Sequence, residues 1–371
     1  MKQKNSFSGQ IGFVFAAAGS AVGVGNLWRF PYLAAKDGGG LFLIIYLVLV
    51  LTVGFVLLTT DIAIGRKTGK SAIYAYESMK KKWKFLGVIT FLVPVLIMTY
   101  YAVIGGWVLR YIVIYLTSSG KQAVADDCFT AFISSPSSVW YGLIFMLLTA
   151  LIVYNGVEEG IERVSKFIMP VLLIMVIGIA IFSLTLKTTP DDGTVRTGLQ
   201  GLKVYMKPDL TGITVGRFLQ ITLDAMSQLF FSLSVSMGIM ITYGSYVKKD
   251  VDLNKAVSQI EIMDTGVAFL AGVMIIPAVF VFSGLDGMSA GPGLMFVSLQ
   301  KVFYSMGTVG RVIGILFFVL AGFAALTSCI SVLESITANC MELFHTERKK
   351  TTRVLSVLYL IATAVIALGY S

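Results

Sequence analysis

The chain has 371 residues, of which 56% are hydrophobic and only 13% are charged. This composition excludes an ordinary soluble domain, in which about a quarter of the residues are charged, and is typical of an integral membrane protein. The net charge of +9 would suggest a nucleic-acid partner in a soluble protein. Here the basic residues gather in loops between apolar segments, as in membrane proteins, so we expect a lipid bilayer and no nucleic acid.

The apolar residues form nine segments of membrane-spanning length, which predict an all-α polytopic membrane protein. In chain order the segments are 10–36, 39–65, 85–117, 138–155, 164–186, 216–247, 256–283, 310–344 and 354–371. A cytoplasmic N-terminus would place 18 of the 29 Lys and Arg residues in inner loops. That bias predicts a cytoplasmic N-terminus. The longest loops, 118–137, 188–215 and 284–309, then lie outside, and the last is either a linker or a re-entrant lid.

The first segment contains AAAGSAVGVGNLWRFP, residues 16–31, which combines three glycines with two polar side chains. Gly19 and Gly23 alone match a small-residue pair for close helix packing. Packing does not require the third glycine, Gly25, or the amide of Asn26. The stretch therefore predicts a helix that is interrupted near the middle of the bilayer.

Later segments carry polar residues at a similar depth. They are Tyr100 and Tyr101 in the third segment, Ser232, Ser234 and Ser236 in the sixth, Asp264 in the seventh, and Thr327 and Ser328 in the eighth. Each hydroxyl has a structural alternative, because serine and threonine bond back to their own helix and tyrosine packs in cores. Asp264 is different, since a carboxylate inside the membrane is a functional candidate by default. Asp61 and Glu162, nearer helix ends, are expected to be solvated.

An interrupted helix offers free N–H groups to an anion and free C=O groups to a cation. Interrupted helices at matching positions of two halves are typical of secondary transporters, and segments one and six, five apart, form such a pair. A channel is disfavoured because the sequence has no selectivity-filter pattern. An enzyme is disfavoured because the single histidine, His345, has no catalytic or metal-binding partners in the sequence.

Three stretches resemble the neurotransmitter:sodium symporter family, and most of all its bacterial amino-acid transporters. They are GSAVGVGNLWRFPYLAAKDGGG at 19–40, SQLFFSLSVSMG with ITYGSYVKKD at 227–250, and AALTSCISVLE at 324–334. The resemblance implies a leucine-transporter-like inverted-repeat fold with discontinuous helices 1 and 6. The first repeat would span 1–187 and an extracellular loop 188–215. The second repeat, 216–371, would be incomplete.

The resemblance also implies one amino-acid site and two sodium sites. The first sodium would be bound by Ala21, Asn26, Ser232 and Asp264, and the second by Gly19, Val22, Ala324, Thr327 and Ser328. The substrate site would comprise Val24, Gly25, Ile97, Tyr101, Phe231, Ser232, Ser234, Met237, Ser328 and Val332. Its lining is mostly apolar and carries no charge, which favours hydrophobic or aromatic amino acids.

One side chain departs from the family pattern. Asp264 stands where many bacterial relatives have an amide, and a fixed carboxylate there predicts independence from chloride. Animal relatives use chloride near the positions of Tyr46, Gln228 and Ser232.

The resemblance also extends to the gates of the family. Arg29 matches the outer gate, whereas Lys4, Tyr246 and Glu342 match the inner one.

The sequence ends within the ninth segment, whereas the family fold has ten helices in its two repeats. We therefore expect either a fragment of a longer protein or a chain completed from elsewhere. The main hypothesis is a sodium-coupled amino-acid symporter of the bacterial inner membrane that works by alternating access. The alternative is a truncated sensor or subunit that binds amino acid and sodium without transport. The oligomeric state stays open.

Overall fold

The computed structural model describes residues 6–118, 120–125, 127–189, 193–284, 287–288 and 290–370. In this part of the chain, seven helices are long and apolar enough to cross a membrane, and one bent pair forms an eighth span. These eight correspond to all the predicted segments except 216–247. That segment forms two shorter helices, α12 and α13, with an irregular stretch between them.

In the described residues of the first half of the chain, to the end of α10, every regular element is a helix. Its elements are α1 (Gln10–Ala21), α2 (Val24–Leu27), α3 (Arg29–Lys36), α4 (Gly40–Leu49), the π-helix η1 (Val50–Gly54), α5 (Phe55–Thr68), α6 (Ala72–Met79), the 3₁₀ helix η2 (Lys81–Trp83), α7 (Lys84–Ser118), the 3₁₀ helix η3 (Lys121–Val124), α8 (Cys128–Ile133), α9 (Ser137–Tyr154), the π-helix η4 (Val157–Glu162) and α10 (Arg163–Thr185).

The second half begins with a short antiparallel hairpin, in which Lys187 pairs with Thr197 and Thr188 with Arg196. Its elements are β1 (Lys187–Thr188), β2 (Arg196–Thr197), α11 (Gly198–Met206), α12 (Val215–Ser232), α13 (Ile239–Gly244), α14 (Leu253–Ser283), the π-helix η6 (Leu294–Ser298), α15 (Leu299–Ser305), α16 (Gly307–Phe344) and α17 (Arg348–Leu368). The predicted loop 284–309 thus contains helical structure, and α15 packs against both α14 and α16.

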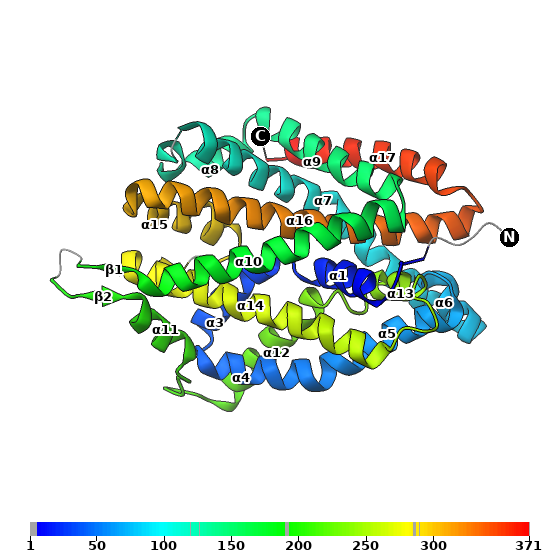
Figure 1. Ribbon diagram of the computed structural model, residues 1–371, viewed down its shortest axis with the longest axis horizontal. Coiled ribbons are helices and arrows are strands. Elements are labelled where there is room, and N and C mark those ends of the chain that lie inside the picture. Colours follow the sequence, from blue (N-terminus) through cyan, green and yellow to red (C-terminus); the bar gives the residue numbers. More distant parts are fainter. Residues whose placement is uncertain are drawn as a thin grey trace.

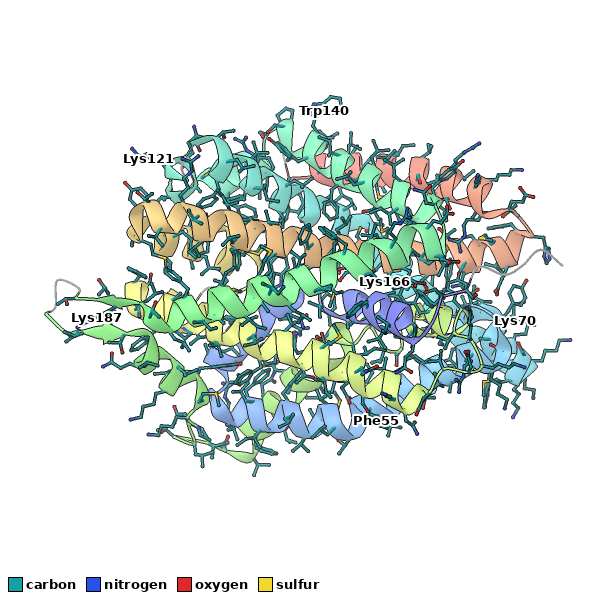
Figure 2. All side chains as sticks on the ribbon, viewed as in Figure 1. Phe55, Lys70, Lys121, Trp140, Lys166 and Lys187 are labelled. Atoms are coloured by element: carbon teal, nitrogen blue, oxygen red, sulfur yellow. The ribbon has the colours of Figure 1, made fainter. Side chains whose placement is uncertain are left out.

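The long helices run roughly along the long axis of the molecule (Figure 1). Helices α1 and α13 lie in the interior, with α9 and α17 at one side and α4 and α5 at the other. In Figure 2, Lys70 marks the end nearer the N-terminus, and Lys121 and Lys187 mark the opposite end. Between the ends, large apolar side chains such as Ile174, Ile262 and Trp140 are more than two-thirds exposed. This is the surface expected of a protein whose sides face lipid.

The first helix is broken where the glycine-rich stretch predicts it. Helix α1 ends at Ala21, and Val22 and Gly23 are extended, with ψ angles of 92° and −178°. Helix α2 then starts at Val24, and the span bends by 57° at this break. The carbonyl end of α1 and the N–H end of α2 consequently face the same interior region.

The sixth span is broken between Ser232 and Ile239. Three residues of this stretch have left-handed backbone conformations: Ser234 (φ 52°), Ser236 (φ 61°) and Gly238 (φ 73°). The N–H of Ser236 donates to Asp61 Oδ2 over 2.8 Å. A neighbouring helix therefore satisfies part of the backbone that leaves helical hydrogen bonding.

The expectation that Asp61 and Glu162 are solvated is wrong, because both side chains are buried. Asp61 faces inward from α5 onto the broken sixth span. Glu162 accepts hydrogen bonds from the backbone N–H and the hydroxyl of Ser8, and it pairs with Lys166. Position near a helix end did not predict exposure here, because neighbouring chain segments cover both carboxylates.

Replacing Gly65 with alanine should destabilise the fold, because α5 packs directly on the backbone of α13. A Cβ atom at Gly65 would lie 1.9 Å from the carbonyl oxygen of Ile241, which no side-chain adjustment relieves. We expect a loss of roughly 1–3 kcal/mol, measured by thermal unfolding in detergent. Gly178→Ala is the control, because a Cβ there meets nothing within 4 Å. Equal melting temperatures for the two variants would contradict this packing.

Candidate functional site

A cluster of oxygen-bearing side chains joins the two broken spans to α14. Asp264 is fully buried on α14. It accepts hydrogen bonds from Asn26 Nδ2 over 2.9 Å and from the Ser232 hydroxyl, which lies 2.9 Å from each carboxylate oxygen. Asn26 Oδ1 in turn accepts from the N–H of Gly23. A carboxylate, an amide and a hydroxyl thus converge beside Ala21, at the end of α1, which is an oxygen-rich setting of the kind that small hard cations prefer.

A second group of oxygen atoms lies where α1 meets α16. A Cβ atom added to Gly19 would lie 3.2 Å from Cβ of Thr327, so the α1 backbone approaches this threonine closely. The Thr327 hydroxyl contacts the carbonyl of Ala324 over 3.3 Å, and the Ser328 hydroxyl donates to the carbonyl of Ser20 over 3.2 Å. Val22 follows directly at the break. Gly19, Ala324, Thr327 and Ser328, four of the five residues that the sequence predicts for a second cation, therefore lie where α1 meets α16.

A small cavity of about 30 Å³ lies between the two breaks. Its walls include seven predicted substrate residues: Ile97, Tyr101, Phe231, Ser234, Met237, Ser328 and Val332. Glycine is needed where α2 approaches Phe231, because a Cβ at Gly25 would lie 2.8 Å from the Phe231 ring. A Cβ at Gly23 would lie 3.1 Å from the Tyr101 hydroxyl. Val24 and Gly25 begin α2, and the first N–H groups of a helix have no partner within it.

Four residues of this cavity are absent from the predicted site: Ser20, Gly23, Ile239 and Ser331. The Ser20 hydroxyl donates to Ser331 over 2.7 Å, and its carbonyl accepts from both Ser234 and Ser328. Ser331 follows Ser328 by three residues, so helical spacing alone places both on one face of α16. Ser20 stands within the glycine-rich stretch, but nothing in the sequence distinguishes it from a packing residue.

A group of charged residues joins α3 and the residue that follows it to α12. Arg29 donates from Nη2 to the Ser227 hydroxyl over 2.8 Å. Beside it, Lys36 pairs with Asp224 over 2.7 Å, and Arg217 pairs with Asp37 over 2.8 Å. Burial raises the pKa of the Asp37 carboxyl, although the two cations oppose that shift. Arg29 thus contacts α12, the first half of the sixth span.

At the other end of the molecule, the side-chain contacts differ from the predicted inner gate of Lys4, Tyr246 and Glu342. Tyr246 donates to Glu334 Oε1 over 2.6 Å, and Arg348 pairs with both oxygens of the same carboxylate. Glu342 instead accepts from the N–H of Ser71 over 3.1 Å. The structure thus pairs Tyr246 with Glu334 in place of Glu342, because Glu334 lies two helical turns deeper on α16, beside Tyr246. Lys4 lies outside the described residues.

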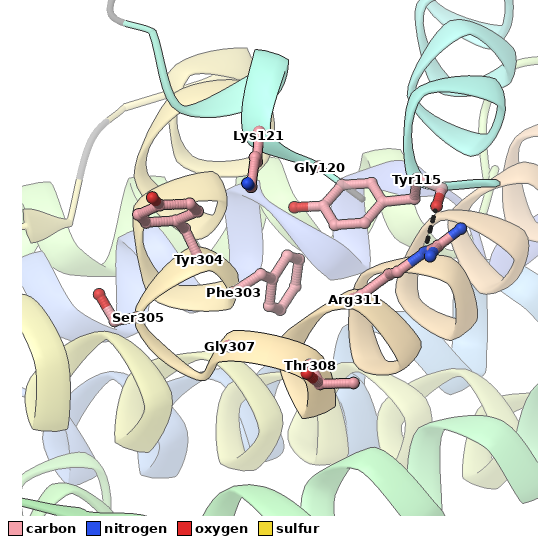
Figure 3. Close-up of a pocket in the computed structure, with 9 residues that line it drawn as sticks. All are labelled: Tyr115, Gly120, Lys121, Phe303, Tyr304, Ser305, Gly307, Thr308 and Arg311. Atoms are coloured by element: carbon pink, nitrogen blue, oxygen red, sulfur yellow. Dashed lines mark hydrogen bonds between the residues drawn. The ribbon is translucent and has the colours of Figure 1, made fainter. Parts of the chain in front are cut away.

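A larger cavity of about 560 Å³ lies away from these clusters, between the end of α7, η3 and the junction of α15 with α16. Figure 3 shows Lys121 and the rings of Tyr115, Phe303 and Tyr304 around it. The guanidinium of Arg311 already has hydrogen-bond partners there, since it donates to the carbonyls of Tyr115 and Leu116 at the end of α7. None of the predicted site residues lines this cavity.

Comparison with known proteins gives a consistent result along the chain. The family described as "Sodium:neurotransmitter symporter family" matches residues 4–137 and 129–370. The sodium-dependent transporter YhdH of Bacillus subtilis is 37% identical over 93% of this chain and 74% of its own length. The chain belongs to the sodium:neurotransmitter symporter family. It is therefore a multi-pass membrane transporter of a sodium-coupled family and not an enzyme.

Further members of the symporter family extend the comparison. A sodium-dependent transporter of Methanocaldococcus jannaschii is 32% identical over 99% of this chain and 76% of its own length. The human sodium- and chloride-dependent taurine transporter is 24% identical over 99% of this chain and 66% of its own length. The crystal structure of MhsT in complex with L-phenylalanine superimposes with a TM-score of 0.85 at 36% identity. It covers 100% of this chain, which covers 82% of the MhsT chain, and it establishes the predicted leucine-transporter-like fold.

Proposed function

We propose that this symporter-family chain couples the transport of hydrophobic or aromatic amino acids to two sodium ions, by alternating access and without chloride. The observation that carries the proposal is the cavity between the two helix breaks, flanked by the Asp264 cluster and the Thr327 group. Free helix ends on opposite sides of one cavity suit a zwitterion and its accompanying cations.

The substrate carboxylate would bind the N–H groups of Val24 and Gly25 and the Tyr101 hydroxyl. Its ammonium would meet carbonyl groups of the broken sixth span near Phe231, Ser232 and Ser234. The side chain would enter the apolar part of the cavity, and MhsT, which binds L-phenylalanine, supports an aromatic substrate. A cavity of about 30 Å³ has to widen for such a ligand. Phe231 and Met237 are only half-buried, and they lie just before and within the irregular stretch, so their movement would provide the room.

The first sodium would be held by Asn26, Ser232, Asp264 and the Ala21 carbonyl, with the substrate carboxylate as a further ligand. The second would be held by Thr327, Ser328 and the carbonyls of Gly19, Val22 and Ala324. Sodium is cargo here, and its binding would fix the relative positions of the broken first span and α16. Because both sites share the backbone of α1, occupation by sodium would favour the geometry that binds the amino acid.

Access would alternate between two ends. We propose that residues 1–187 and 216–371 form the two repeats, that 188–215 is an outer loop, and that the N-terminus is cytoplasmic. Arg29, with the Lys36–Asp224 and Arg217–Asp37 pairs, would then close the outer side. Tyr246, Glu334 and Arg348 would close the inner side.

The test is binding of radiolabelled amino acids to the purified 371-residue chain, in sodium and in potassium. Saturable binding of Leu, Phe, Tyr or Trp in sodium only would support the proposed site. Uptake into proteoliposomes then separates a transporter from a protein that only binds. Binding that is equal in both cations would contradict sodium coupling, and no binding of any of the four would contradict the substrate assignment.

Thr327→Val should lower the apparent sodium affinity about tenfold, because one charge-assisted oxygen contact is lost at constant shape. The measurement is a sodium titration of amino-acid binding. Thr149→Val is the matched control, since Thr149 is also buried and donates to its own helix at Phe145. The same shift in both variants, or in neither, would count against a cation at Thr327.

A further inference from the structure

A groove of about 510 Å³ lies on the lipid-facing side of the molecule, between α4 with η1 and α14. It shares no lining residue with the cavity between the helix breaks. Its walls are almost entirely apolar, and its rim includes Ile44, Leu51 and Ile262, each more than half exposed toward the sides of the molecule. The volume lies in the range of ligand pockets, and the opening faces the bilayer.

Three lining residues carry polar side chains, namely Tyr46 on α4 and the pair Glu261 and Thr265 on α14. Glu261 lines the groove with only 5% of its surface exposed, and Oε1 of its carboxylate is buried without a hydrogen-bond partner among the described residues. The buried hydroxyl of Thr265 is likewise unpartnered there. These residues are four apart on α14, so their side chains lie on the same face of the helix, one turn from each other.

The groove contains no basic side chain of its own. Its lining residues are apolar apart from Glu261, Thr265 and Tyr46. A buried carboxylate without a cation is costly in an apolar setting, so a cationic ligand would be strongly favoured. A divalent metal ion does not fit, because it needs about six oxygen ligands and the lining offers few. A cation that carries its own hydrocarbon matches both the carboxylate and the walls.

We propose that this groove binds a lipid-soluble primary ammonium compound. Its ammonium group would donate hydrogen bonds to Glu261 Oε1 and Thr265 Oγ1. Its hydrocarbon chain would lie along Leu43, Leu47 and Phe269, which line the same groove. Gly266 leaves the space beside the ammonium open, because a Cβ added there meets nothing within 4 Å.

The test measures binding of radiolabelled dodecylamine to the full chain in nanodiscs of zwitterionic lipid, with empty nanodiscs subtracted. Dodecanol is the uncharged comparison with the same chain length. Dodecylamine should bind saturably, one per chain, and at least about tenfold more tightly than dodecanol, as expected for a charge-assisted contact. Glu261→Gln should remove this preference while leaving dodecanol unaffected. Equal binding of the two probes, or an unchanged preference in Glu261→Gln, would overturn the proposal.

Gly266→Leu tests the same groove without touching its polar atoms. Leucine improves helix propensity over glycine and would fill the space, so binding of dodecylamine should fall about tenfold or more. Gly178→Leu is the matched control, because Gly178 is another helical glycine with nothing within 4 Å of an added Cβ, on α10. Thr265→Val should weaken dodecylamine binding by a smaller factor. If both glycine variants bind as the unaltered chain does, the ammonium does not occupy this groove.

Discussion

Replacing Asp264 with asparagine is expected to make amino-acid binding depend on chloride. Asp264 is fully buried, and it contacts Asn26 and Ser232 at the break of each discontinuous span. Asparagine keeps the shape and removes the negative charge beside the proposed first sodium. At an effective dielectric constant of about 20, a charge pair about 4 Å apart is worth several kcal/mol, so affinity without chloride should fall about 100-fold or more.

A chloride ion could replace the missing charge, because suitable groups are nearby. The amide of Gln228 is fully buried, and neither its nitrogen nor its oxygen has a hydrogen-bond partner within the described residues. The measurement is sodium-dependent binding of phenylalanine in chloride and in gluconate. We expect chloride to restore much of the affinity of Asp264→Asn and to leave the unaltered chain unaffected. If the variant stays independent of chloride, the carboxylate does not serve in place of the anion.

Arg348→Ala should destabilise the fold more than Gly65→Ala does, because it leaves the buried carboxylate of Glu334 without its cationic partner. The side chain of Glu334 is completely buried, and both of its oxygens pair with Arg348, over 2.6 and 2.8 Å. Among the described residues, removing the guanidinium leaves the buried carboxylate with Tyr246 as its one remaining hydrogen-bond partner. Breaking a buried ion pair in this way costs about 3–5 kcal/mol, so the melting temperature in detergent should fall clearly.

Arg353→Ala is the control for Arg348→Ala on the same helix. Arg353 donates to the Tyr154 hydroxyl in an exposed position, and its removal should cost less than about 1 kcal/mol. Arg348→Lys keeps the charge but loses the two-pronged geometry, so it should lie between the two alanine variants. Similar melting temperatures for Arg348→Ala and Arg353→Ala would show that the Glu334 pair contributes little.

The sequence predicted the fold class and the breaks in the first and sixth spans, because both depend on local chemistry. Glycines and an amide inside an apolar segment have few explanations, and Gly23 lies at the break. Depth counted along each span also grouped Asp264 with Ser232, and these two side chains are in contact. The positions along the helices carry that information without any knowledge of side-chain contacts.

Pairings between distant side chains could not be predicted in the same way. Tyr246 contacts Glu334 and not Glu342, which lies eight residues later on the same helix. Both glutamates are about two turns apart on one face, so spacing alone does not choose between them. The burial of Asp61 depends on the irregular stretch at Ser236, whose conformation forms only when the helices are assembled. Glu261 and its groove likewise depend on how α4 packs beside α14.

The left-handed serines in the sixth span have an energetic consequence for the proposed transport cycle. Ser234 and Ser236 are not glycines, and each such residue costs about 1–2 kcal/mol of backbone strain. The Asp61 contact holds part of this strained stretch in place. A rearrangement that relaxes one serine would regain enough free energy to change a population ratio about 5- to 30-fold. In the proposed alternating-access cycle, free energy stored at the break would lower the cost of leaving this conformation for one in which a serine relaxes.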